Sequence, residues 1–121
     1  MFRFQKLEVW QESITYGSKV YNVVETFPKD ELFGLSSQLK RASLSISSNI
    51  AEGSGSSSVK DFCNFLDIAI KSTLETVSQL LFAKERGYIS EAKVNELYEE
   101  AEKLTKRIQG LKQYLKNKKY E

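Results

Sequence analysis

The sequence predicts an all-α protein: one domain, residues 1–121, folded as an antiparallel up-down-up-down four-helix bundle. Apolar residues recur at alternating spacings of three and four in four segments, which is the pattern of helices that pack along one side. Short stretches rich in Gly, Pro or Ser separate these segments. No segment shows the two-residue period of a strand at comparable strength. Because the connections are short, consecutive helices are expected to be antiparallel neighbours.

Each of the four segments has its own apolar stripe. The first segment carries it at Leu7, Trp10, Ile14, Gly17, Tyr21 and Val24. The second segment carries it at Leu32, Leu35, Leu39, Ala42, Ile46 and Ile50. The third is apolar more broadly, at Phe62, Phe65, Leu66, Ala69, Ile70, Thr73, Val77, Leu80 and Leu81. The fourth carries its stripe at Leu97, Ala101, Leu104, Ile108, Leu111 and Leu115.

Three breaks separate the segments, and each is followed by a residue that can cap the next helix. The breaks lie at Pro28, at 53–57 and at Gly87. The predicted caps are Asp30, Ser58 (in a capping box with Asp61) and Ser90.

Composition narrows the functional class. The 121 residues suffice for one hydrophobic core, and 18 Lys and Arg against 16 Asp and Glu leave a net charge of only +2. The chain has no His, the commonest general base and metal ligand. Its single cysteine, Cys63, excludes an internal disulfide and a thiolate zinc cluster within one chain. No residues have the spacing of a catalytic dyad. We therefore expect a non-enzymatic protein without cofactor, metal ion or small-molecule substrate.

The hydropathy of the chain points away from membranes. The first residues, Met1 to Lys6, lack the apolar core of a signal peptide. No apolar run approaches the ~18 residues of a membrane span. We expect a cytoplasmic protein that does not interact with a membrane.

The third segment predicts self-association. Its apolar residues, among them Ile68, Leu74 and Phe82, cover more than one face of a helix. A helix that is apolar nearly all round is buried on more than one side, whereas each helix of a four-helix monomer keeps an outer face. A homo-oligomer is therefore favoured over the alternative, which is scattered apolar residues on an ordinary surface.

A polar stripe lies opposite the apolar stripe of the second segment. Spacing alone favours a solvated face, but Asn49 sits beside Ile46 and Ile50, where a half-buried amide needs a hydrogen-bond partner and can fix the pairing of helices or subunits. The alternative is therefore an oligomer interface, for which the candidate residues are Gln38, Arg41, Ser45, Ser48, Asn49 and Glu52. Glu75, an acid within the apolar third segment, has a ready ion-pair partner in Lys71.

Charge is polarised along the fourth segment, with acids in its first half and bases in its second. Two interpretations are evenly balanced. Acids near a helix N-terminus and bases near its C-terminus complement the helix dipole. Alternatively, the basic half binds nucleic acid, and Tyr114 and Tyr120 among the lysines stack on bases. In an oligomer, several such basic ends would converge and their field would far exceed that of one chain.

Several motifs in register carry a resemblance to a known family. They are Leu7-Glu8-Val9-Trp10-Gln11, Phe27-Pro28-Lys29-Asp30-Glu31-Leu32-Phe33-Gly34-Leu35, Gln38-Leu39-Lys40-Arg41-Ala42, Ser45-Ile46, Ser48-Asn49-Ile50-Ala51-Glu52-Gly53, Asp61-Phe62 with Phe65-Leu66, and Ser72 with Glu75. The sequence resembles the bacterial four-helix-bundle family of the 23S rRNA intervening-sequence protein. The same fold family includes accessory variability proteins of diversity-generating retroelements. The motifs cover the first three segments, and the fourth matches in pattern only.

The resemblance implies a four-helix bundle that assembles in related proteins into a five-fold ring. The retroelement relatives resemble nucleic-acid-binding partners of a reverse transcriptase, with a basic surface around the ring. This chain departs from the family pattern at three positions. Ser56 stands where a basic residue is common, Lys71 where a glycine is usual, and Ser47 where a proline is frequent. The first departure removes one candidate phosphate contact per subunit.

Two hypotheses follow from different classes. The leading one is a homo-oligomer, with a pentamer as the candidate form, that binds structured RNA or DNA. Its predicted nucleic-acid contacts are Lys40, Arg41, Lys106, Arg107, Lys112, Lys116, Lys118 and Lys119. The alternative is a homo-oligomeric protein–protein scaffold or accessory subunit that binds no nucleic acid. A regulatory partner encoded beside its target is a weaker third interpretation.

Overall fold

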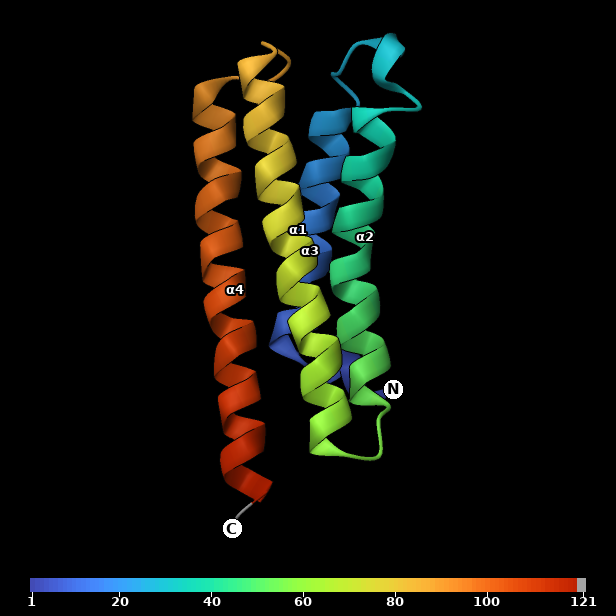
Figure 1. Cartoon of the computed structure of the whole chain (residues 1–121), viewed down its shortest axis with the longest axis vertical. Coiled ribbons are helices and arrows are strands. Elements are labelled where there is room, and N and C mark those ends of the chain that lie inside the picture. Colours follow the sequence, from blue (N-terminus) through green and yellow to red (C-terminus); the bar gives the residue numbers. More distant parts are fainter. Residues whose placement is uncertain (120–121) are drawn as a thin grey trace.

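The computed structural model describes residues 1–119, with the side chain of Lys119 left out, and within them the predicted four-helix bundle is confirmed. The helices are α1 (Glu8–Val24), α2 (Leu35–Ser54), α3 (Val59–Glu85) and α4 (Glu91–Lys119), with short 3-10 turns η1 (Arg3–Lys6) and η2 (Lys29–Glu31). Figure 1 shows the helices running alternately up and down, so that each is antiparallel to the next. No strand occurs in this part of the chain.

Each helix packs against the next in the chain, and α4 closes the bundle by packing against α1. α1 and α3 therefore face each other diagonally across the core, as do α2 and α4. The apolar stripe predicted for α2 is buried from Leu39 onward, at Leu39, Ala42, Ile46 and Ile50. The stripe predicted for α4 is buried at Leu97, Ala101, Leu104, Ile108 and Leu115.

The apolar stripe predicted for α1 is only partly correct: Val24 is buried and Leu7 and Trp10 pack half-buried against the core, but its middle points outward. Ile14 and Tyr21 are exposed, and the core is filled instead by Val9, Ser13, Tyr16, Val20 and Val23. The two stripes have the same alternation of three and four and differ only by a rotation of the helix, so spacing cannot distinguish them. Tyr16 settles the choice because its hydroxyl finds a partner in the core, Thr76 Oγ1 at 2.7 Å.

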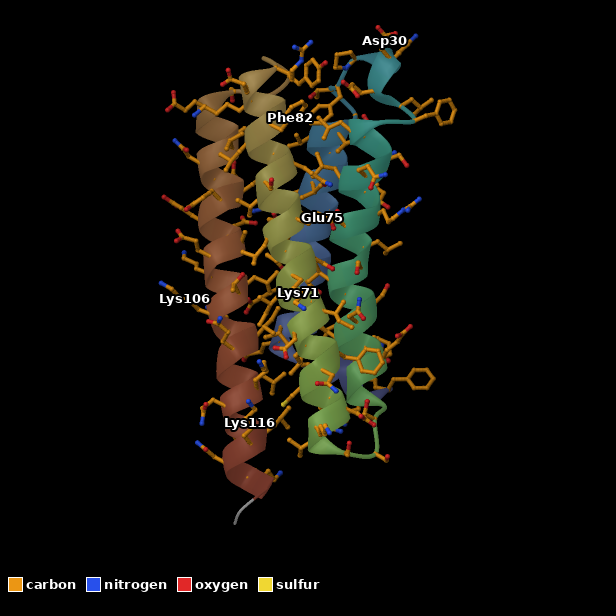
Figure 2. All side chains as sticks on the ribbon, in the orientation of Figure 1. Asp30, Lys71, Glu75, Phe82, Lys106 and Lys116 are labelled. Carbon is orange, nitrogen blue, oxygen red and sulfur yellow. The ribbon has the colours of Figure 1, made fainter. Side chains whose placement is uncertain are left out.

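The start of α2 also differs from the prediction. Asp30 does not cap this helix: it lies in η2, at the tip of the connection after Pro28 (Figure 2). Leu32 follows η2 and is exposed, and α2 begins only at Leu35. The capping carboxylate belongs to Glu31, whose Oε1 accepts a hydrogen bond from the Leu35 N–H at 3.2 Å. The η2 turn displaces the cap by one residue.

The break predicted at 53–57 is shorter than expected, because Gly53 and Ser54 are the last residues of α2. A Cβ atom on Gly53 would lie 2.8 Å from Phe65 Cβ and 2.9 Å from Phe62 Cδ1. This glycine therefore lets α2 and α3 approach closely at the end of the bundle where they connect.

Two predicted caps are confirmed, at the starts of α3 and α4. Ser58 caps α3 by accepting a hydrogen bond from the Asp61 N–H at 3.1 Å. Gly87 has φ +77°, in the left-handed region that favours glycine, and Ser90 caps α4 by accepting a bond from the Lys93 N–H at 3.2 Å.

Candidate assembly and nucleic-acid surfaces

A chain of hydrogen bonds joins α2 to α3 at the middle of their contact. Ser45 Oγ lies 2.9 Å from Ser72 Oγ, and the Asn49 amide donates to the Ser45 carbonyl at 2.8 Å and to Ser45 Oγ at 2.9 Å. Asn49 is half-buried and hydrogen-bonded, as its position beside Ile46 and Ile50 predicts. Both of its bonds go to Ser45 within α2, so the Ser45–Ser72 bond is the link of this chain that joins the two helices.

The residues predicted as an oligomer interface lie on one surface, which we call the α2–α3 face. Gln38, Arg41, Ser48 and Glu52 are exposed there, beside the half-buried Ser45 and Asn49. The outer surface of α3, which adjoins this face, carries two exposed apolar residues. Ile68 is 44% exposed and Phe82 is 55% exposed. The polar stripe of α2 and the excess apolar surface of α3 thus adjoin each other.

Two of the bases predicted to bind nucleic acid form ion pairs that join α4 to its neighbours. Arg107 pairs with Glu12 on α1, and Lys112 pairs with Asp67 on α3. Nearer the start of α4, Lys19 on α1 pairs with Glu100, and this carboxylate is the main cause of a raised pKa at Lys19. Exposed pairs of this kind stabilise a protein only weakly, because water and salt screen them.

The predicted nucleic-acid contacts do not form a single patch. Lys40 and Arg41 lie on α2, which is diagonal to α4 (Figure 1). The Lys40 ammonium lies 5.4 Å from the centroid of the Tyr21 ring, toward α1. On α4, the Lys118 ammonium lies 5.7 Å from the Tyr114 ring. The side chain of Lys119 and all of Tyr120 lie outside the described part of the chain.

Lysines of α3 complete a basic surface that was not predicted from the sequence. The pairing of Lys112 with Asp67 aligns the first half of α3 with the second half of α4. Lys60 and Lys71 are exposed on α3, and Figure 2 shows Lys71 at the same level of the bundle as Lys106. We call this surface the α3–α4 face and define it by Lys60, Lys71, Lys106, Lys112 and Lys116.

Lys71 is available for this surface because it does not form the ion pair expected with Glu75. Among the described residues Lys71 forms no ion pair, and Glu75 Oε1 accepts a long hydrogen bond from Gln79 Nε2 at 3.4 Å. The sequence does contain a signal for this basic surface, which is the spacing of Lys60 and Lys71 on one helix. That spacing is informative only when α3 is known to lie antiparallel to α4.

The charge of the chain is concentrated around the α3–α4 face. Residues 60–71 and 106–116 together contain six bases and two acids, whereas the whole chain has a net charge of +2. The rest of the chain is therefore net negative. One of the two acids, Asp67, is paired with Lys112.

Within residues 1–119, none of the helices combines the length and the apolar character that crossing a bilayer requires. A four-helix bundle with two distinct exposed faces, one mixed apolar and polar and one basic, defines a class of small helical-bundle proteins. The sequence model of the 23S rRNA-intervening sequence protein family matches residues 5–110, so the chain belongs to that family.

Among solved structures, the chain is similar to a protein of unknown function from the S23 ribosomal protein family of Bacteroides thetaiotaomicron VPI-5482. The two share 25% sequence identity with a TM-score of 0.79, over 85% of this chain and 96% of that one. None of the curated proteins matches this chain.

Proposed function

We propose that the protein is a non-enzymatic, self-associating helical bundle that binds structured RNA or DNA through the α3–α4 face. The observation that carries this proposal is the presence of five lysines on the adjacent helices α3 and α4, four of them exposed and the fifth, Lys112, paired with Asp67. Lysines bind phosphates as point charges and release counterions from the nucleic acid, so a cluster of them gives affinity that falls steeply with salt. Membership of the intervening-sequence protein family also supports nucleic-acid binding.

A second observation, the position of Lys71, also supports nucleic-acid binding by the α3–α4 face. The chain lacks the base that the family commonly has at position 56, but it has a lysine at position 71, where a glycine is usual. Lys71 is exposed on the α3–α4 face. The absence of a cation in the α2–α3 connection is therefore offset by a cation within the proposed binding surface.

Fluorescence anisotropy of a structured RNA hairpin and a matched DNA duplex, titrated with protein at several salt concentrations, tests this proposal. The informative variant is Lys71→Glu/Lys116→Glu, since neither lysine forms an ion pair with a described residue. We expect weaker binding and a salt slope smaller by about 0.9 for each duplex phosphate that the variant no longer neutralises.

The matched control is Lys29→Glu/Lys103→Glu, which changes the net charge equally. Lys29 lies in η2, and Lys103 faces the groove between α1 and α4. Equal effects of the two double variants, or no effect of either, would contradict the assignment of the α3–α4 face.

A second candidate function, a protein–protein scaffold, is favoured by a specific observation. Arg107 and Lys112 are engaged in ion pairs, while Ile68 and Phe82 expose apolar surface on the α2–α3 face. If no nucleic acid binds even at low salt, this interpretation replaces the first, and the bases of α4 serve to hold the bundle together.

A further inference from the structure

A cleft between α3 and α4 adjoins the basic surface and is not explained by phosphate binding. Its volume is about 310 Å³. Leu74 and Val77 of α3 line it with five residues of α4 besides Lys106: Tyr98, Ala101, Glu102, Thr105 and Gln109. Lys106 belongs both to this cleft and to the α3–α4 face, so the two are continuous.

The walls of the cleft suit a flat, largely apolar group. Leu74, Val77 and Ala101 provide aliphatic contacts, and Leu74 is 58% exposed. The Tyr98 ring is 42% exposed and forms no hydrogen bond with a described residue. An exposed aromatic ring in one cleft with a lysine, here Lys106, is an arrangement by which proteins stack an unpaired base while a cation holds its backbone.

The polar groups of the cleft distinguish a base from a phosphate. Thr105 and Gln109 offer a hydroxyl and an amide, which can donate to or accept from the edge of a base. The Glu102 carboxylate repels a phosphate, but it accepts a hydrogen bond from an exocyclic amino group. The cleft therefore suits the base, and Lys106 with Lys71 suits the adjoining phosphates.

We infer that the α3–α4 cleft binds an unpaired nucleobase, stacked on Tyr98, of a nucleic acid whose phosphates lie along the α3–α4 face. The inference rests on the proposed function and narrows it, because a base inside a duplex cannot enter the cleft. The preferred ligand is a single-stranded segment or the loop of a hairpin.

The test compares two RNA probes with equal numbers of phosphates, one single-stranded and one fully paired. We expect Tyr98→Ala to weaken binding of the single-stranded probe on the order of tenfold and to leave binding of the duplex unchanged. Tyr98→Phe keeps the ring and should bind as the unaltered protein does. Phe33→Ala is the control, because Phe33 is an exposed aromatic residue that lies outside the cleft and outside the α3–α4 face. It should change neither affinity.

Each other outcome has a defined meaning. An equal loss of affinity for both probes would show that Tyr98 contacts the backbone, and the base site would be wrong. If Tyr98→Ala changes the mass of the assembly and leaves the affinity for both probes unchanged, a second copy covers the cleft. This result would also overturn the inference. Salt-dependent binding that Tyr98→Ala leaves intact would refute the base site alone. Absence of binding by the unaltered protein would refute the proposed function itself.

Discussion

Tyr16 places a hydroxyl in the core of the bundle, on the diagonal between α1 and α3. Thr76 Oγ1 donates its own proton to the Thr73 carbonyl at 2.6 Å, so Tyr16 is the donor in the 2.7 Å bond to Thr76. Burial raises the pKa of Tyr16 to about 12. The Tyr16 hydroxyl is thus hydrogen-bonded within an apolar core. Because this hydroxyl can ionise, the stability of the core depends on pH at high pH.

We predict that the folded protein loses stability at high pH. Between pH 10 and about 12 an unfolded chain ionises this tyrosine while the folded chain keeps it neutral, so the unfolded state binds fewer protons. The free energy of unfolding should therefore fall across this window, by roughly 2 to 3 kcal/mol in total. Urea unfolding at a series of pH values measures it.

The control for this prediction is Tyr16→Phe, which removes the ionisable group. At neutral pH we expect it to cost about 1 kcal/mol, since the hydrogen bond to Thr76 is removed. Lysines that deprotonate in the same window affect both proteins alike. Parallel pH profiles of the two proteins would show that Tyr16 is not the cause.

At the scale of the elements, the close contact of α2 with α3 depends on Gly53. An added Cβ would meet the Cβ of Phe65 and the ring of Phe62, which cannot both withdraw without moving α3. Gly53→Ala should therefore lower the free energy of unfolding by about 1 to 3 kcal/mol, although alanine favours a helix.

Gly110 provides the matched comparison within α4. Apart from its own neighbours in the helix, no described residue lies within 4 Å of the position that its Cβ would take. Gly110→Ala should raise the free energy of unfolding by up to about 1 kcal/mol. Thermal or urea unfolding monitored by circular dichroism distinguishes the two variants. A stabilised Gly53→Ala protein would mean that α2 and α3 separate more easily than their packing indicates.

The elements also show how far the sequence predicts this fold. The number, order and antiparallel arrangement of the helices follow from periodicity and breaks. The orientation of α1 does not, because two stripes with equal spacing compete and the choice depends on a hydrogen bond to α3. The cap of α2 moves from Asp30 to Glu31 because η2 inserts a turn, which no local pattern distinguishes from the start of the helix.

At the scale of the whole molecule, the candidate surfaces depend on which helices are neighbours. The α2–α3 face could be anticipated, since its polar stripe lies on one helix. The basic surface could not, because the sequence pattern grouped Lys40 and Arg41 with the bases of α4. Because α2 and α4 are diagonal, Lys40 and Arg41 are separated from the bases of α4. The neighbour of α4 is α3, which carries Lys60 and Lys71.

The proposal that copies assemble through the α2–α3 face gives a prediction at this scale. Ile68→Lys/Phe82→Lys should lower the molar mass of the assembly, measured by size-exclusion chromatography with light scattering, because charges would replace its exposed apolar residues. Ile14→Lys/Leu44→Lys, at exposed apolar positions that line a groove between α1 and α2, is the control. If only the control lowers the mass, the copies meet through α1 and α2 instead.

The uneven distribution of charge has a consequence for how the proposed assembly and the proposed nucleic-acid binding influence each other. Copies arranged side by side in the same direction would align the lysines of their α3–α4 faces in one tier, where like charges repel. A bound polyanion would neutralise that tier and strengthen the contacts between copies. By thermodynamic reciprocity, the assembled form would then bind the polyanion more tightly than a free subunit does. Binding of the polyanion and association of the copies would therefore increase or decrease together, and the salt concentration would affect both.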